Sequence, residues 1–175
     1  MSGELFLSFN RYLRGRFGVR VHRLSIDAGF SCPNIDGTLD TAGCVFCNNR
    51  AFSRHRFSVT GIAQQIEDSM AFYRKRFKAG KFVAYFQSHT NTHADPAVLR
   101  ERYDIIRRYP DIVGLFISTR PDCVDDARLD VIASYAADYL VWVRDEQTAT
   151  LLRWDGSGWV VESDLAQDGL YQYVA

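Results

Sequence analysis

Four short runs of apolar residues divide the chain and predict β-strands. The first alternates apolar with polar positions and is rich in β-branched residues, and the second is a short, continuous apolar run. Both patterns are typical of strands buried on one or both faces. The four runs cover Val19–Ile26, Lys81–Gln87, Ile112–Ser118 and Tyr139–Val143.

Between these runs, apolar residues recur every three or four positions and predict three helices. The first helix spans residues 59–78, and we expect Gly80 to end it. Asp95 is the predicted N-cap of the second helix, which Pro110 ends, and Asp125 caps the third. The expected buried faces comprise Ile62, Ile66, Met70, Tyr73 and Phe77 in the first helix, Val98, Leu99, Tyr103 and Ile106 in the second, and Leu129, Ile132 and Ala136 in the third.

The alternation of strands and helices predicts an α/β fold with about four parallel strands and right-handed crossovers. In such folds the functional residues gather at the carboxyl ends of the strands. A cysteine-containing loop follows the first strand, residues 87–93 follow the second, and residues 119–123 follow the third. We therefore expect Cys32, Gln87 and Arg120 to lie at one end of the sheet.

The pattern changes after Val143. Residues 148–163 read as a β-hairpin whose turn is Asp155-Gly156-Ser157-Gly158. Residues 164–175 are acidic and aromatic without a clear period. These features divide the chain into a core of residues 1–143 and a tail of residues 144–175.

Composition favours a cytoplasmic protein with no membrane partner. Apolar residues make up 47% of the chain, yet no apolar run is long enough to span a bilayer, and no secretory signal is recognisable. Charge is uneven: residues 1–81 carry 13 Lys and Arg against 6 Asp and Glu, and residues 82–175 carry 8 against 15. The basic half could meet a phosphate backbone. The simpler interpretation, which we favour, is that Arg74, Lys75, Arg76 and Lys78 form the solvated end of one helix.

Three cysteines are the strongest chemical signal in the chain. Cys32, Cys44 and Cys47 follow the pattern C-x11-C-x2-C on one loop rich in Gly and Asp. Three thiolates can bind three irons of a [4Fe–4S] cluster. They can also provide three of the four ligands of a structural zinc, with Cys123 or His55 as the fourth. A disulfide would leave one of the three unpaired, and the expected reducing compartment disfavours it.

Longer motifs around these cysteines resemble the radical S-adenosylmethionine (radical SAM) superfamily. The nearest branch is the YhcC-like bacterial proteins, which replace the commoner C-x3-C-x2-C motif by one with a long first gap. The resemblance covers roughly residues 8–143. It is carried by Leu24–Asn34 with Asp36-Gly37-Thr38, by Gly43–Cys47, by Ala84–Gln87 with Thr90-Asn91-Thr92, and by Ser118–Cys123.

The resemblance implies a partial (β/α) radical-SAM-type barrel with helices on its outer face, and it implies two cofactors. Cys32, Cys44 and Cys47 would ligate a [4Fe–4S] cluster, and S-adenosyl-L-methionine would bind its fourth iron and be cleaved to a 5′-deoxyadenosyl radical. An external electron donor would supply the electron. The expected cofactor-binding residues are Phe46, Gln87, Thr90, Asn91, Ser118 and Arg120. The resemblance leaves the substrate and the substrate-directed catalytic residues unknown.

The chain departs from the family after the fourth strand. There the family continues into a Glu and a Gly-x-Gln segment that contacts the cofactor, whereas this chain reads Arg144-Asp145-Glu146-Gln147. The barrel is thus expected to be truncated or replaced after about residue 143. An incomplete parallel sheet exposes an edge beside its last strand. We expect the Trp154/Trp159 hairpin or a second copy of the chain to cover that edge.

Three functions remain open from the sequence. The leading one is an iron–sulfur radical SAM protein whose incomplete barrel leaves its activity in question. The second is a non-catalytic zinc or iron–sulfur binding module. The third is a tRNA-modifying radical enzyme, for which RNA would be the partner; the basic half of the chain and a resemblance to elongator-type enzymes support it.

Overall fold

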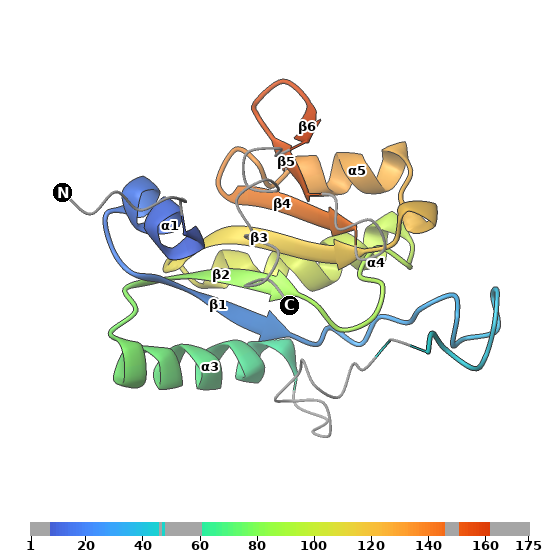
Figure 1. Ribbon diagram of the computed structural model, residues 1–175, viewed down its shortest axis with the longest axis horizontal. Coiled ribbons are helices and arrows are strands. Elements are labelled where there is room, and N and C mark those ends of the chain that lie inside the picture. Colours follow the sequence, from blue (N-terminus) through green and yellow to red (C-terminus); the bar gives the residue numbers. More distant parts are fainter. Residues whose placement is uncertain (1–7, 46, 48–60, 146–150, 162–175) are drawn as a thin grey trace.

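The computed structural model describes residues 8–45, 47, 61–145 and 151–161, which form an α/β fold around one mixed sheet (Figure 1). The strands lie side by side in chain order. Their bounds are β1 Val21–Ile26, β2 Lys81–Phe86, β3 Ile112–Thr119, β4 Leu140–Asp145, β5 Leu151–Trp154 and β6 Trp159–Val161. The four strands predicted from apolar runs are confirmed as β1 to β4, with ends that differ by about two residues or fewer.

The three predicted helices are present, and each ends earlier than predicted; the third ends at Ala133, so Ala136, expected on its buried face, lies beyond it. The first helix ends at Phe77 because Lys78 adopts the left-handed conformation (φ 55°), two residues before the predicted stop at Gly80. The second ends at Tyr103 and continues as a 3-10 turn. Asp125 caps the third helix as predicted, accepting from the Arg128 amide at 2.9 Å. Helical bounds are α1 Phe9–Phe17, α3 Ile62–Phe77, α4 Pro96–Tyr103, η1 Asp104–Arg108, η2 Pro121–Cys123 and α5 Asp126–Ala133.

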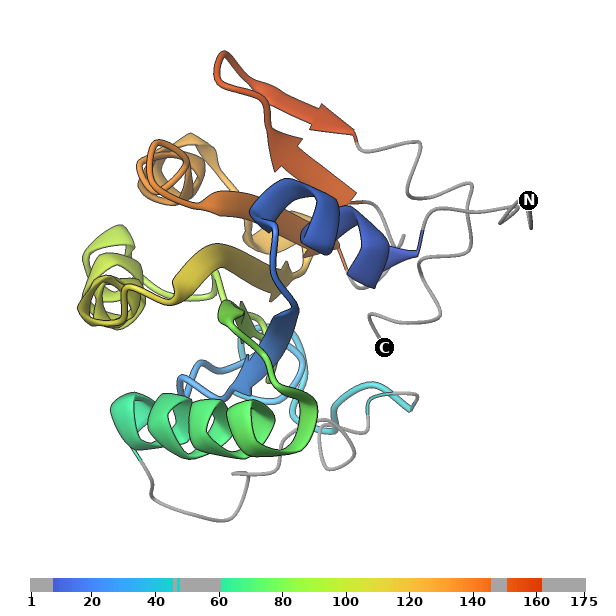
Figure 2. The ribbon, with the colours of Figure 1, turned by 90° about the vertical axis from the view of Figure 1, so that its left-hand side faces the viewer.

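The first four strands are parallel neighbours, as the βα alternation predicts. Helices α3, α4 and α5 connect them and lie on one face of the sheet (Figure 2). The main core lies between this face and the three helices, and apolar burial there is the chief stabilising term. The side chains that fill it include Leu24, Ile66, Phe82, Phe86, Leu99, Ile106, Leu115, Ile117, Ile132 and Val143.

The opposite face of the sheet carries a helix that the sequence reading missed. Helix α1 begins after Ser8, whose hydroxyl accepts from the Arg11 amide at 3.3 Å, and it places Leu13 in a second, smaller core. Phe9 and Tyr12 lie against Trp142, with ring centroids 5.5 and 5.6 Å apart. The expectation of helices on one face was therefore incomplete, because the strands are apolar on both faces and each face needs a cover.

The predicted hairpin is confirmed, and it closes the edge of the parallel sheet. Strand β5 pairs antiparallel with β4, and β6 pairs antiparallel with β5. The rings of Trp154 and Trp159 meet edge to face at 5.6 Å, and Trp159 packs against the main core. The exposed edge expected beside β4 is thus covered by the chain itself. No described helix is long and apolar enough to cross a membrane.

Leu13→Ala is expected to lower the free energy of unfolding by about 2–5 kcal/mol, since Leu13 is 1% exposed and its loss leaves a cavity between α1 and the sheet. Urea unfolding monitored by circular dichroism measures the change. Leu39→Ala is the matched control, because Leu39 is 64% exposed and should change stability by less than about 0.5 kcal/mol. Equal effects of the two variants would mean that α1 does not pack as described.

Candidate functional site

Cys32, Gln87 and Arg120 follow β1, β2 and β3 at the same end of the sheet, as predicted (Figure 1). The register supports this, since Ile26 pairs with Phe86 and Phe86 with Ile117 across three parallel strands. The loop that carries the first three cysteines therefore leaves the sheet beside the polar segments that follow β2 and β3.

A buried glutamine of α3 fixes the start of the cysteine loop. The Gln65 side chain is 3% exposed and binds both backbone groups of Asp27: its Oε1 accepts from the Asp27 amide at 2.9 Å, and its Nε2 donates to the Asp27 carbonyl at 2.8 Å. The Asp27 carboxylate accepts from the Gly29 amide at 2.9 Å, and Gly29 has the positive φ of 69° that favours glycine. These contacts set the direction in which the loop leaves β1.

Gln65→Leu is expected to lower the free energy of unfolding by about 2–3 kcal/mol, because it removes two hydrogen bonds and leaves the Asp27 amide and carbonyl unpaired. Hydrogen exchange at the Asp27 amide should accelerate in the same variant. Gln64→Leu is the control, since Gln64 is an exposed neighbour that bonds only the surface carboxylate Asp68 among the described residues. An unchanged exchange rate of the Asp27 amide in Gln65→Leu would contradict the conclusion that Gln65 holds the Asp27 backbone.

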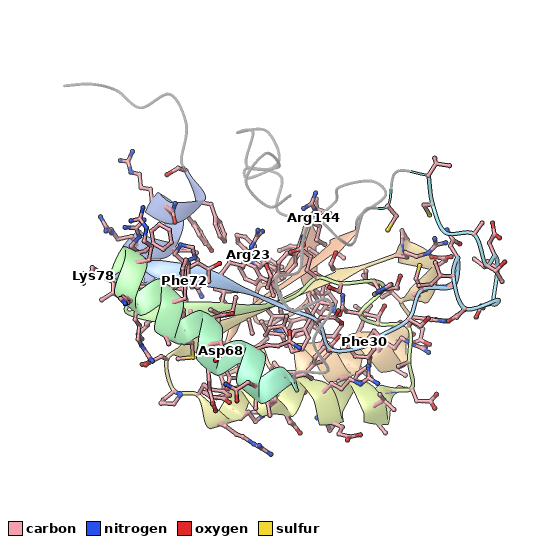
Figure 3. The ribbon with its side chains drawn as sticks, turned by 90° about the horizontal axis from the view of Figure 1, so that it is seen from below. Arg23, Phe30, Asp68, Phe72, Lys78 and Arg144 are labelled. Carbon is pink, nitrogen blue, oxygen red and sulfur yellow. The ribbon has the colours of Figure 1, made fainter. Side chains whose placement is uncertain are left out.

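A second contact comes from α4. Arg102 donates to the Ala28 carbonyl at 2.7 Å, and its guanidinium lies 4.4 Å from the centre of the Phe30 ring. Phe30 is 5% exposed and belongs to the main core (Figure 3). Residues 27–30 are consequently held by two helices before the first cysteine is reached.

The two arms of the cysteine loop are joined by Asn34. Its side-chain amide donates to Cys44 Sγ at 2.8 Å, and its backbone carbonyl accepts from the Gly43 amide at 2.8 Å. The Cys32 backbone carbonyl accepts from backbone amides of the turn that follows it. The Cys44 backbone carbonyl accepts from the Cys47 amide at 2.9 Å. The long gap of the C-x11-C motif is thus folded back on itself, which brings residues 34 and 44 together.

None of the three cysteines of the motif forms a disulfide bond. Cys32 and Cys44 are half-buried and Cys47 is exposed. Within the described residues, no three His, Cys, Asp or Glu side chains converge as a metal-binding group. Phe46, a predicted cofactor contact, and His55, a candidate zinc ligand, lie outside the described residues.

The cysteine loop is also tied to the segment after β2. His93 Nε2 lies 2.8 Å from Asp36 Oδ2. The Thr38 hydroxyl and amide bond the other carboxylate oxygen at 2.7 and 3.0 Å. Hydrogen bonds from Thr38 and, less strongly, His93 hold the pKa of Asp36 well below its usual value. This carboxylate therefore stays ionised over the physiological pH range.

Buried polar side chains gather where β2 and β3 end. Among them is Asn91, which is fully buried; its side-chain amide donates to the Ser118 carbonyl at 3.0 Å, and its own carbonyl accepts from the Tyr103 hydroxyl. Asn91 Oδ1 has no hydrogen-bond partner among the described residues. The group comprises Ser88, Thr90, Asn91, Thr92, Ser118 and Thr119.

Two members of this group connect neighbouring loops. The Thr90 amide donates to the Ser31 carbonyl at 3.1 Å, next to Cys32 in the chain. The Thr92 hydroxyl bonds Thr119 Oγ1 and donates to the Cys123 carbonyl at 2.7 Å. A buried polar group must be hydrogen-bonded to avoid a desolvation penalty, and the Thr92 and Thr119 hydroxyls satisfy each other in this way.

Gln87 and Arg120 have local partners. Gln87 Oε1 accepts from the Ser25 hydroxyl at 3.3 Å. The Arg120 guanidinium makes a double contact with the Asp122 carboxylate at 2.9 and 2.7 Å, which raises the pKa of Arg120 and lowers that of Asp122. Arg120, expected to contact the cofactor, is thus paired with Asp122 in the structure.

The fourth cysteine lies close to this pair. Burial raises the pKa of the Cys123 thiol to about 11, and the Asp122 charge acts in the same direction. A thiol with a raised pKa is a weaker metal ligand and nucleophile, because the thiolate is the reactive form. Cys123 is therefore a poor thiolate donor in this environment.

Arg144 lies beside Ser118 in the register of β3 and β4, on the face of the sheet away from α3 and α4 (Figure 3). Its Nε is buried and has no hydrogen-bond partner in the described part of the chain. Of residues 144–147, where the resemblance implies a Glu and a Gly-x-Gln segment, Arg144 is the residue whose side chain is described; residues 146 and 147 lie outside the described residues.

The chain is similar to three bacterial and archaeal proteins. Uncharacterized protein YtqA of Bacillus subtilis is 37% identical over 154 residues, covering 83% of this chain and 47% of the relative. Protein YhcC of Escherichia coli is 40% identical over 141 residues, covering 80% and 45%. Uncharacterized protein MJ0486 of Methanocaldococcus jannaschii is 32% identical over 146 residues, covering 81% and 44%.

The chain spans about half the length of the curated relatives it matches. No protein-family model and no solved structure matches it. The similarity agrees with the YhcC-like resemblance read from the motifs. Because the names of these relatives state no activity, the radical SAM assignment stays a prediction.

Proposed function

We propose that this chain carries the cluster-binding part of a radical SAM iron–sulfur protein, with Cys32, Cys44 and Cys47 as the ligands of a [4Fe–4S] cluster. The observation that carries this proposal is that three cysteines outside any disulfide share one loop, which leaves β1 at its carboxyl end. In parallel α/β folds that end of the sheet is where active sites lie.

The donor set fits the cluster. Three thiolates leave one iron of a [4Fe–4S] cluster available for a small-molecule ligand, and the bound cluster supplies an electron at low potential. The chain's own residues orient and tune the ligands. Asn34 donates to the Cys44 sulfur, and hydrogen bonds to sulfur change the reduction potential of such clusters. Gln65 and Arg102 hold the arm that precedes Cys32.

S-adenosyl-L-methionine is the proposed ligand of this site. Thr90 and Asn91 follow β2 beside the cysteine loop, and Asn91 Oδ1 is a buried acceptor without a hydrogen-bond partner among the described residues. An amino group is the kind of donor that satisfies such an acceptor. Gln87 and Ser118 offer further polar groups near the same end, whereas Arg120 is engaged by Asp122.

Anaerobic reconstitution of the full chain with iron and sulfide tests the proposal. The expected product holds about four irons and four sulfides per chain and absorbs broadly in the visible blue. Its spectrum should change when S-adenosyl-L-methionine is added. A chain that binds about one zinc and assembles no cluster would instead identify the non-catalytic zinc module, with Cys123 as the candidate fourth ligand.

A further inference from the structure

Strand β4 carries two buried N–H donors that lack a hydrogen-bond partner among the described residues. Trp142 is 2% exposed, and its indole Nε1 is one of these donors; the buried Nε of Arg144 is the other. Side chains two positions apart on a strand point to the same face of the sheet, so both donors lie on the face that α1 packs against. A buried Trp N–H usually finds an acceptor, and a buried charged group needs one still more. The two donors together therefore mark a position for an acceptor ligand.

The chemistry of these donors favours a ligand with negative charge. An indole N–H and a guanidinium donate hydrogen bonds and cannot accept them. Arg153 of β5 pairs with Trp142 in the antiparallel register, which adds a second cation beside the indole. Among the described side chains that β1 to β4 place on this face, none is acidic. Charge-assisted hydrogen bonds to an oxyanion would satisfy both donors and balance the positive charge.

The surroundings combine a rigid aromatic side with access for an ion. The Phe116 ring stacks on Trp142 with centroids 4.7 Å apart, and Phe9 of α1 lies 5.5 Å from Trp142 on the same criterion. These rings hold the indole in place and keep water from it, which strengthens a hydrogen bond to a charged ligand. Arg144 is half-buried and projects from the sheet on the side away from α3 (Figure 3), so its guanidinium is within reach of an ion from solvent.

We propose that Trp142 Nε1 and Arg144 bind the oxyanion group of a small molecule, a carboxylate or a phosphate. Ligands of parallel α/β sheets bind at the carboxyl ends of the strands, and Arg144 is the next-to-last residue of β4. The positive charge of Arg144 opposes the sulfonium of S-adenosyl-L-methionine, which makes that cofactor a poor occupant of this position. Binding of the oxyanion does not depend on the proposed function, whereas a role for it as a substrate group beside the cluster rests on that function.

Titration of the full chain with sodium acetate or inorganic phosphate, followed by proton–nitrogen correlation NMR of side-chain N–H groups, tests the proposal. The Trp142 indole and Arg144 Nε signals are expected to move downfield together and to saturate with one Kd, because both protons gain an acceptor. Sodium chloride at the same ionic strength should leave both signals in place. Saturation by acetate alone would identify a carboxylate site, and saturation by phosphate alone a phosphate site.

Three variants assign the contacts. Arg144→Gln is expected to weaken anion binding about tenfold or more, because it removes the charged partner of a buried hydrogen bond. Trp142→Phe keeps a stacked ring and removes the N–H, so it should weaken binding about fivefold. Arg108→Gln is the matched control for charge and should bind normally, since Arg108 is exposed and lies in η1, before the amino end of β3. Circular dichroism checks that each variant folds.

Unchanged signals of Trp142 and Arg144 in the parent chain would overturn the proposal, as would equal shifts with chloride. Equal weakening in Arg108→Gln and Arg144→Gln would also overturn it, because the anion would then respond to overall charge. Cys44→Ala should bind the anion normally without assembling a cluster. This variant separates a failure of the oxyanion site from a failure of the proposed function.

Discussion

Replacing Cys44 or Cys47 by alanine is expected to abolish cluster assembly, with iron and sulfide contents at least about tenfold below those of the parent chain. Each thiolate of the motif is proposed to hold one iron, and two thiolates do not retain a cluster that needs three. Colorimetric iron and sulfide determination after anaerobic reconstitution measures the loss. Both cysteines lie away from the cores, so the fold should persist, which circular dichroism checks.

Cys123→Ala is the control for this prediction. Its thiol is half-buried with a pKa raised to about 11, and it follows β3 rather than β1. The variant should assemble as much cluster as the parent chain. Loss of metal from Cys123→Ala to the same extent as from Cys44→Ala would show that four thiols act together, as in a structural zinc site, and would contradict the three-cysteine cluster.

The sequence predicts the parallel sheet well because each of its four strands is a local apolar run and a helix separates each strand from the next. It does not predict α1, although Phe9, Tyr12, Leu13 and Phe17 have helical spacing. Gly15 in the middle of this segment lowers its helix propensity, and its apolar residues alternate with arginines. The helix is stabilised by packing on Trp142 and Phe116, which are remote in the chain. Tertiary contacts of this kind leave little local signal.

The same difference between local sequence signals and tertiary contacts applies to the candidate site. Motif residues could be predicted, because Cys32, Gln87 and Arg120 each follow a strand and parallel strands end together. The residues that hold them in place could not be predicted, since the hydrogen bonds between Gln65 and the Asp27 backbone depend on how α3 packs against β1. A usable signal existed: Gln65 is a polar residue in the apolar stripe of an amphipathic helix, where a buried amide needs partners.

A fifth parallel strand cannot pair with β4 in this structure, because the hairpin occupies that edge. Trp142, Val143 and Arg144 pair with β5 in antiparallel register. The radical-SAM-type barrel that the resemblance implies would continue there with another parallel strand. The described sheet is therefore a mixed one, and the wall that would enclose a bound cofactor next to β4 is replaced by a two-stranded ribbon.

This chain is accordingly expected to cleave S-adenosyl-L-methionine at least about a hundredfold more slowly than a family enzyme, even when a cluster is assembled, because small errors in positioning a reactive group carry penalties of that size. Arg144 further disfavours binding of the cofactor. It stands where the radical SAM resemblance implies a Glu, it cannot accept a hydrogen bond, and its positive charge would oppose the sulfonium of the cofactor. Its Nε is buried without a hydrogen-bond partner in the described residues.

The measurement is 5′-deoxyadenosine formed by reconstituted chain with dithionite and S-adenosyl-L-methionine, together with cofactor affinity by equilibrium dialysis. Arg144→Glu should bind the cofactor several-fold more tightly, since it exchanges a repulsive charge for an attractive one, yet it should remain slow because the hairpin still occupies the β4 edge. Arg108→Glu is the charge-matched control and should leave the affinity unchanged, because Arg108 is exposed and lies in η1, before the amino end of β3. Multiple turnovers by the parent chain would show that a mixed sheet closed by a hairpin positions the cofactor well enough for catalysis, and that the Glu and Gly-x-Gln segment is dispensable.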